Sequence, residues 1–258
     1  MISVCIATYN GEQYLKKQID SILEQIGKDD EIVVSDDGST DRTLEILEEY
    51  KDSRIKVLHH KKNPAWTGRT AASFLFASDN FENAINNSKG DIIFLSDQDD
   101  IWHKDRVSTV VPLMKDYSMV MCNFSAIDGD GKIITQKFRD TDPVSKMFIK
   151  NLIHPPFLGC CMTLRREALD LAMPFPSPCV GHDFWIGCLL MHLGLPYKFI
   201  MEPLHLYRMH GNNVSPAYSK SKNSLYFKIA YRMRLTYNML KRTVKLRLCH
   251  KQTNSNTK

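Results

Sequence analysis

The sequence predicts an α/β fold in which helices flank both faces of a mostly parallel sheet. Short apolar segments rich in β-branched residues alternate along the first half of the chain with segments of helical periodicity. Such alternation is typical of parallel strands joined by helical crossovers. Polar loops follow three of the apolar segments. In sheets of this kind ligands bind beyond the carboxyl ends of the strands, so we expect the functional site there.

The apolar and periodic segments predict the elements in order. We expect strands over residues 2–7, 31–35, 54–58, 91–95 and 119–123. We expect helices over residues 12–26, 42–50, 71–86 and 103–115, and Ser39 or Thr40 should cap the second of them. In the second half we expect a hairpin turn at 128–132, a helix over 166–172, a helix from 181 to about 194 and a strand over 204–208.

Composition is ordinary for a soluble globular protein, with 43% hydrophobic and 24% charged residues among 258. No uninterrupted apolar run is long enough to span a bilayer, and the first residues lack the basic segment and cleavage region of a signal peptide. The seven cysteines include no C-x-x-C pair, and most lie in apolar surroundings. They predict buried thiols in a reducing compartment, and therefore a cytoplasmic location.

Positive charge is concentrated at the C-terminal end. Residues 220–258 hold eleven Lys and Arg and no Asp or Glu, whereas the residues before them hold 23 basic and 29 acidic residues. From Ser224, apolar residues recur at helical spacing: Leu225, Ile229, Met233, Leu240, Val244 and Leu248. This basic amphipathic helix either lies on the inner face of an anionic membrane or packs on the domain with a solvated basic face. Residues after Gln252 are expected to be disordered.

Three carboxylates follow the strand expected over residues 91–95. Asp97, Asp99 and Asp100 lie in the segment Ser-Asp-Gln-Asp-Asp-Ile-Trp with no basic residue between them. Like charges this close repel, and a divalent cation that neutralises them explains the arrangement. A carboxylate-rich site without sulfur suits Mg²⁺ or Mn²⁺, and Mg²⁺ is usually shared with substrate phosphates. The alternative is a solvated turn in which Asp99 or Asp100 caps a helix.

Two more polar loops fall at the same edge of the sheet. Residues 8–11 (Thr-Tyr-Asn-Gly) follow the first strand and residues 36–41 (Asp-Asp-Gly-Ser-Thr-Asp) follow the second. The carboxylates of Asp36 and Asp37 can accept N–H groups of a ligand, and Gly38 leaves room beside them. A helix-capping turn is the other interpretation. The motifs of dinucleotide-binding domains and P-loops are absent from the sequence.

These three motifs, in this order, resemble those of the family 2 glycosyltransferases, which have the GT-A fold, and the third is similar to the bacterial rhamnosyltransferase-like branch. The resemblance covers residues 2–215, which suggests a GT-A domain over 1–219 and a basic helical tail over 220–258. It implies that Thr8, Tyr9 and Asp37 contact the base and ribose. It also implies that Asp97 contacts the ribose or a metal-bound water and that Asp99, in the D-x-D motif, binds the metal. The expected nucleotide-sugar-binding set also includes Asn10, Asp36 and Gln98.

Residues 181–187 (Gly-His-Asp-Phe-Trp-Ile-Gly) open a helix in the second half of the chain. Asp183 either caps that helix or, by the resemblance, is the general base that takes the proton from the acceptor hydroxyl. His182 stands where many relatives have Glu, so its role near the acceptor is open. Trp185 is either a platform for a sugar ring or part of the core.

The segment 207–213 (Tyr-Arg-Met-His-Gly-Asn-Asn) resembles the closing motif of the family. The resemblance implies that His210 approaches the diphosphate and the metal, with Arg208 as its neighbour. His205 has a weaker claim, and we expect it to be structural.

We therefore expect a metal-dependent inverting glycosyltransferase, a hexosyltransferase, in which inversion follows from the resemblance alone. It would transfer a sugar from a UDP- or dTDP-linked donor to a hydroxyl of a growing, lipid-linked cell-surface polysaccharide. It would act as a peripheral protein on the inner membrane face, with no nucleic-acid partner. One alternative is a catalytically silent nucleotide-sugar-binding scaffold subunit, against which the complete set of carboxylates counts. The other is a nucleotidyltransferase, which needs a Gly-rich basic loop that residues 8–12 do not provide.

Overall fold

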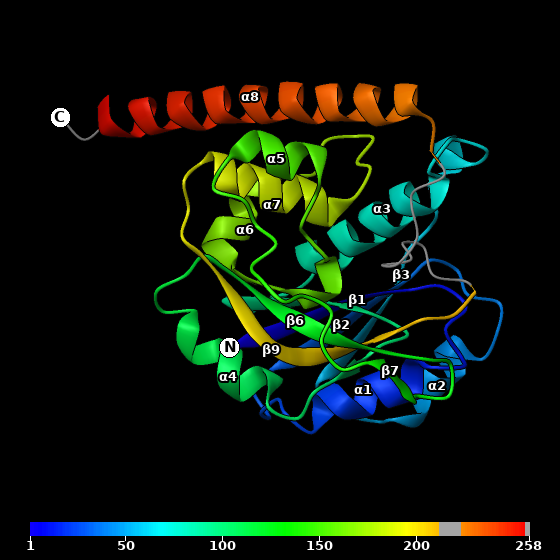
Figure 1. Cartoon of the computed structure of the whole chain (residues 1–258). Helices are drawn as coiled ribbons and strands as arrows, with labels where there is room; N and C mark the ends of the chain where they lie inside the picture. Colours follow the sequence, from blue (N-terminus) through cyan, green and yellow to red (C-terminus); the bar gives the residue numbers. More distant parts are fainter. Residues whose placement is uncertain (212–222, 256–258) are drawn as a thin grey trace.

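The structure is a computed structural model that describes residues 1–211 and 223–255. A curved sheet lies at the centre of the molecule, with helices above and below it (Figure 1). This arrangement confirms the predicted α/β class.

The first half of the chain builds the parallel part of the sheet. Its strands are β1 (Ile2–Thr8), β2 (Glu31–Asp36), β3 (Ile55–His59) and β4 (Ile92–Asp97), in the spatial order β3-β2-β1-β4. In the parallel register Thr8 pairs with Asp36, and Asp36 pairs with His59. Ala7 pairs with Asp97. The ends of all four strands therefore lie at one edge, where the predicted motifs begin.

The parallel series ends at β4. The other strands are β5 (Ile101–Trp102), β6 (Met119–Ile127), β7 (Ile133–Thr135), β8 (Met162–Arg165) and β9 (Tyr197–Arg208). β8 lies between β4 and β6 and is antiparallel to both. β6, which completes the alternating pattern in the sequence, is therefore not a neighbour of β4. The predicted hairpin is confirmed, because Ile127 pairs with Ile133.

Helices cover the two faces of the sheet and enclose two apolar clusters. One cluster is covered by α1 (Leu15–Leu23), α2 (Thr43–Glu49) and α4 (Arg106–Leu113). The other is covered by α3 (Ala72–Asn86), α5 (Phe148–Ile153), α6 (Arg166–Ala172) and α7 (His182–His192). Two 3-10 turns, η1 (Pro64–Trp66) and η2 (Gly159–Cys161), lie between these helices and strands.

The start of α2 differs from the prediction. Its N-cap residue is Arg42, and no side chain caps the helix. The Ser39 hydroxyl instead donates to Asp36 and accepts from the backbone N–H of Asn10. The Thr40 N–H donates to Oδ1 of Asn10 at 2.9 Å. These polar residues therefore join the loops after β1 and β2, and both lie before Arg42, the N-cap residue of α2.

The predicted C-terminal helix is present as α8 (Leu225–Ser255) and continues past Gln252. It lies across the helices α5 and α7 at the top of the molecule (Figure 1). Leu235 and Met239 are buried against the domain. The six apolar residues singled out in the sequence are instead 51–74% exposed: Leu225, Ile229, Met233, Leu240, Val244 and Leu248. The helix is thus packed on the domain and still exposes an apolar face. Within the described ranges, no helix is apolar over enough length to cross a membrane.

Candidate active site

Carboxylates from two distant parts of the chain gather at the carboxyl edge of the sheet. Asp97 ends β4, Asp99 and Asp100 follow it, and Asp183 lies in the first turn of α7. Burial raises the pKa of Asp97 well above its usual range, and the charges of Asp100, Asp99 and Asp183 raise it further. A bound cation would relieve this repulsion.

Asp99 faces His210. Oδ2 of Asp99 lies 2.6 Å from Nε2 of His210, and the two side chains are 17% and 16% exposed. Solvent therefore reaches the pair, as a site for a diphosphate requires. His210 also lies beside Tyr14, with 5.2 Å between ring centroids.

Arg208 lies beneath this pair. It is fully buried, and its Nε donates to the carbonyl oxygen of Asp99 at 2.8 Å. Its Nη1 donates to the carbonyl oxygens of Asp128 and Gly129 in the β6–β7 turn. We expected Arg208 near the diphosphate or acceptor. Its guanidinium instead holds the backbone of the loop that carries Asp99, because three of its donor contacts go to carbonyl oxygens.

Asp100 anchors the same loop from inside the protein. Its Oδ1 accepts the Arg208 N–H at 2.8 Å, and its Oδ2 accepts Nε2–H of His205 at 2.7 Å. Nδ1 of His205 then accepts from Nη1 of Arg106. Burial and the charge of Arg106 lower the pKa of His205 well below its usual value, so the imidazole is neutral. The prediction that His205 is structural agrees with this complete burial.

The described residues fit a hard divalent cation better than a soft one. Close groups of metal-ligating atoms are Asp97, Asp100 and Cys160, and Cys160, Cys161 and His205. Both nitrogens of His205 and both oxygens of Asp100 already have hydrogen-bond partners. Asp97 and Asp99 could supply oxygen ligands, since the contact with His210 uses Oδ2 of Asp99, and this chemistry suits Mg²⁺ or Mn²⁺.

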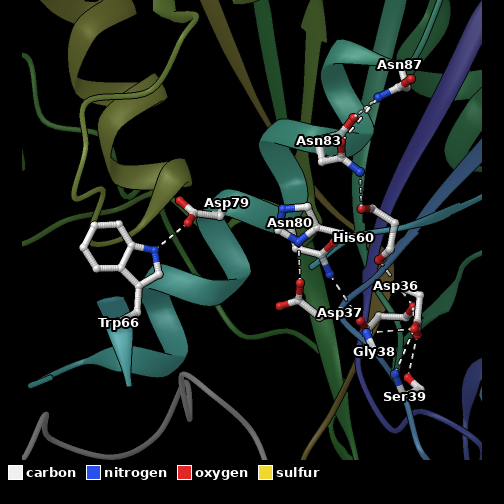
Figure 2. A network of polar contacts seen from close by, with 12 residues as sticks. Asp36, Asp37, Gly38, Ser39, His60, Trp66, Asp79, Asn80, Asn83 and Asn87 are labelled. Carbon is white, nitrogen blue, oxygen red and sulfur yellow. Dashed lines mark hydrogen bonds and ion pairs between the residues drawn. The ribbon is translucent and has the colours of Figure 1, made fainter. Parts of the chain in front are cut away.

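The loop after β2 is held by Asp36, and the buried Asp37 next to it lies against His60 (Figure 2). The carboxylate of Asp36 accepts from Thr8, Gly38 and Ser39, so both of its oxygens are occupied. Oδ1 of Asp37 accepts from Nδ1 of His60 at 2.5 Å. Burial raises the pKa of Asp37, and the hydrogen bond from His60 opposes the rise. The geometry therefore favours Asp37 over Asp36 as the acceptor for a base N–H.

Two of the expected nucleotide-binding residues brace the loop after β1. The Gln98 side chain accepts from the Tyr9 N–H at 2.9 Å and donates to the Tyr9 carbonyl at 3.1 Å. A Cβ at Gly11 would lie 2.5 Å from Oε1 of Gln98, so a larger residue there would displace the Gln98 side chain from Tyr9. Asn10 joins the neighbouring loop, as described above. The Tyr9 ring is 46% exposed and lies under Nζ of Lys62.

Asp183 is not a helix cap. The N-cap residue of α7 is Gly181. Oδ2 of Asp183 accepts from the Gly159 N–H at 3.2 Å, and Oδ1 accepts from the Phe184 N–H at 2.7 Å. Two backbone groups, one of them in η2, therefore fix the carboxylate in position next to the acidic cluster.

The two neighbours that we expected near the acceptor are buried. Trp185 is 1% exposed, and its indole N–H donates to the carbonyl oxygen of Ala172. It is therefore part of the core, which is one of the two alternatives that the sequence left open, and is not a platform for a sugar ring. His182 is 8% exposed and lies against Phe81, with 4.2 Å between ring centroids. Burial lowers the pKa of His182, so it supports the turn before Asp183 as a neutral ring.

Sequence reasoning missed His60, Asn80 and the pair of Arg106 with His205. The side-chain amide of Asn80 donates to the Thr8 carbonyl oxygen and lies beside Asp37 and His60 in Figure 2. The signal for His60 was present in the sequence. The run His-His-Lys-Lys at 59–62 begins at the last residue of β3. It falls at the same sheet edge as the three motifs. For Arg106 no signal was available, since its partners are distant in sequence.

The parallel strands β1 to β4, with an acidic loop at their carboxyl edge, are part of a mixed sheet that has the GT-A fold. A family model described as "Glycosyl transferase family 2" matches residues 3–171, more than half of the chain. The chain therefore belongs to glycosyltransferase family 2, as its sequence motifs predicted.

Three relatives illustrate the similarity. An uncharacterised glycosyltransferase of Nostoc is 31% identical, over 82% of this chain and 66% of the relative. The dTDP-rhamnosyl transferase RfbG of Shigella flexneri is 28% identical, over 81% and 72%. The Escherichia coli enzyme WfgD, named UDP-Glc:alpha-D-GlcNAc-diphosphoundecaprenol beta-1,3-glucosyltransferase, is 27% identical, over 73% and 70%.

Solved structures show the same fold. TarS 1–349 of S. aureus in complex with UDP has a TM-score of 0.65 and 20% identity, over 92% of this chain and 64% of that chain. The Pyrobaculum calidifontis mannosyltransferase PcManGT in complex with GDP-Man and Mn²⁺ has a TM-score of 0.55 and 19% identity, over 83% and 58%. The chain thus spans about two thirds of the length of several proteins that it matches.

Proposed function

We propose that this chain is an inverting glycosyltransferase that uses a UDP- or dTDP-linked sugar and a divalent cation. The observation that carries the proposal is the convergence of Asp97, Asp99 and Asp183 at one sheet edge, where Asp99 and Asp183 both lie close enough to act electrostatically on Asp97. Membership of the family supports the reaction class. The relative that uses dTDP-rhamnose and the neighbour that binds UDP support a pyrimidine donor.

The base site is formed by the loops after β1, β2 and β3. Asp37 accepts the N–H of the pyrimidine ring through the oxygen that His60 does not hold. Tyr9, which is exposed beside it, offers a ring face to the base. Asp36, Asn10 and Gln98 act indirectly, because they fix the shape of the two loops.

Asp97, Asp99 and His210 would hold a Mg²⁺ or Mn²⁺ ion, which as a Lewis acid stabilises charge on the leaving diphosphate. The neighbour that contains Mn²⁺ supports this assignment. Asp183 takes the proton from the acceptor hydroxyl, and its hydrogen bond from Gly159 keeps the carboxylate aimed at the site. The displacement from the face opposite the diphosphate inverts the sugar.

The acceptor in this proposal is a hydroxyl of a lipid-linked saccharide, and the protein acts on the inner face of an anionic membrane. The relative whose name includes a diphosphoundecaprenol acceptor supports the class of acceptor. The basic residues that accumulate after residue 220 support the membrane.

The direct test is a screen of the purified chain against a panel of nucleotide sugars with Mn²⁺. We expect hydrolysis or transfer with at least one UDP- or dTDP-linked sugar, and loss of this turnover on chelation. Nucleotide binding without turnover of any donor would instead identify a scaffold subunit.

A further inference from the structure

The outer side of α8 carries a straight apolar stripe. Its members are 51–84% exposed: Leu225, Tyr226, Ile229, Met233, Tyr237, Leu240, Val244 and Leu248. From Tyr226 the pattern repeats every eleven residues, since Tyr226, Tyr237 and Leu248 are so spaced. Eleven residues correspond to about 3.67 per turn, close to the 3.6 of an α-helix. The stripe therefore runs along one side of the helix and fits a flat surface.

The opposite side of α8 is fixed to the domain. Leu235 and Met239 are buried, and Arg232 donates to the carbonyl oxygens of Leu152 and Ile153 at the end of α5. Arg242 donates to carbonyl oxygens at the end of α6 and just beyond it. With about 100° per residue, Val244 lies roughly 180° around the helix from Leu235. The stripe therefore faces directly away from the domain.

Basic residues line one flank of the stripe. Arg234, Lys241 and Lys245 are exposed and lie roughly 80–120° around the helix from Leu235. No Asp or Glu occurs in the sequence of α8. An apolar stripe with a cationic flank complements an anionic lipid surface, where acyl chains take the apolar side chains and headgroups take the cations.

α8 also lies close to the general base. The ring of Tyr231 meets the ring of Phe184 edge-on, with 6.0 Å between centroids, and Phe184 follows Asp183 in the chain. An α-helix with its side chains is about 10–12 Å across. A surface on the outer face of α8 would therefore lie about one helix diameter from the turn that carries Asp183.

We propose that the stripe of α8 lies in the interface of an anionic bilayer, and that α8 is a fixed spacer that sets the height of Asp183 above the lipid. The assignment of Asp183 as the base rests on the proposed function. The spacer deepens that function, because an acceptor hydroxyl close to its lipid end reaches Asp183 while the protein stays bound.

Co-sedimentation of the full-length protein with phosphatidylglycerol vesicles tests the surface. We expect Leu240→Ser with Val244→Ser to lower the partition coefficient about tenfold or more, because apolar burial is lost. Lys241→Gln and Lys245→Gln should each lower it about fivefold at low salt and less at high salt. Ile133→Ser with Ile134→Ser is the matched control, since both residues are exposed on β7, across the molecule from α8 (Figure 1). This control should bind as the parent does.

The orientation has its own readout. Among the described residues Cys249 is exposed and the other cysteines are buried, so a Cys249→Ser background allows labelling at chosen positions. A fluorophore on Met233→Cys should be quenched by nitroxide lipids, and one on Ile134→Cys should not.

Three results would overturn the proposal. They are absence of parent binding, equal binding by the α8 and β7 double variants, and a parent dimer in light scattering that Leu240→Ser with Val244→Ser dissociates. The last would make the stripe a contact between two copies. None of these measurements requires sugar transfer. A result that overturns the membrane contact would therefore leave the proposed reaction standing, and absence of sugar transfer would leave the membrane contact standing.

Discussion

At the residue scale, protonation of Asp37 would control donor recognition in the proposed base site, and His60 is hydrogen-bonded to Asp37. Asp37 must be ionised to accept the ring N–H of a pyrimidine. Burial raises its pKa, whereas the hydrogen bond from His60 lowers it. Affinity for UDP or dTDP should therefore be lost as the pH falls through this raised pKa.

His60→Ala should move that loss of affinity to higher pH, because desolvation of Asp37 is then opposed less. His60→Asn is the conservative partner, since its amide N–H occupies the position of Nδ1 and should restore much of the parent profile. Calorimetric titration of UDP at a series of pH values measures both. Identical pH profiles for the parent and His60→Ala would show that His60 does not act on Asp37.

The metal site gives a second prediction for single residues. Asp99→Ala should abolish the part of nucleoside diphosphate binding that depends on Mn²⁺, because the carboxylate beside His210 is removed. Asp105→Ala, at an exposed carboxylate beyond the cluster, is the control. Unchanged affinity of Asp99→Ala with and without Mn²⁺ would exclude Asp99 as a ligand.

At the scale of elements, the start of α4 is tied to the loop that carries Asp99 and Asp100 through buried polar groups. Arg106 is fully buried, and it donates to His205 on β9 and to the carbonyl oxygen of Cys160 in η2. His205 in turn binds Asp100. Three elements therefore meet at one guanidinium, directly behind the acidic cluster.

Arg106→Met should lower the free energy of unfolding by about 3–5 kcal/mol, because it leaves Nδ1 of His205 and the carbonyl oxygen of Cys160 without a donor and removes a cation that favours the buried carboxylate of Asp100. Arg42→Met, at an exposed arginine that pairs with Glu45, should leave the free energy of unfolding close to the parent's. Urea unfolding of the two variants measures the difference. Equal losses would mean that the buried network does not hold the loop.

The sequence was most informative where local pattern decides the structure. The ends of β1, β2 and β4 and the β6–β7 hairpin follow from short apolar runs and turn residues. Local pattern could not decide the role of Trp185. Because α7 is apolar on nearly every side, the sequence does not distinguish a core side chain from a platform for a sugar ring. Nor could it place β8 between β4 and β6, because an antiparallel insertion depends on contacts far apart in the sequence.

At the scale of the whole molecule, the proposed donor and acceptor functions lie on two halves of the chain. β1 to β4 present the nucleotide loops, whereas α7 brings Asp183 to the same edge and α8 covers the helices beside it (Figure 1). The tail offered two alternatives in the sequence, membrane contact or packing on the domain. α8 has separate faces for the two, since Leu235 and Met239 pack inward while Val244 points outward.

Asp183 is proposed as the base of a sugar-transfer reaction, in a site that binds the donor without the help of Asp183. Asp183→Asn keeps the size of the side chain and removes the base. Parallel measurement of UDP binding and of transfer from the donor identified in the panel tests the claim most directly. We predict unchanged nucleotide affinity and a transfer rate about 10²–10⁴-fold lower than the parent's. A full transfer rate in Asp183→Asn would show that Asp183 is not the base.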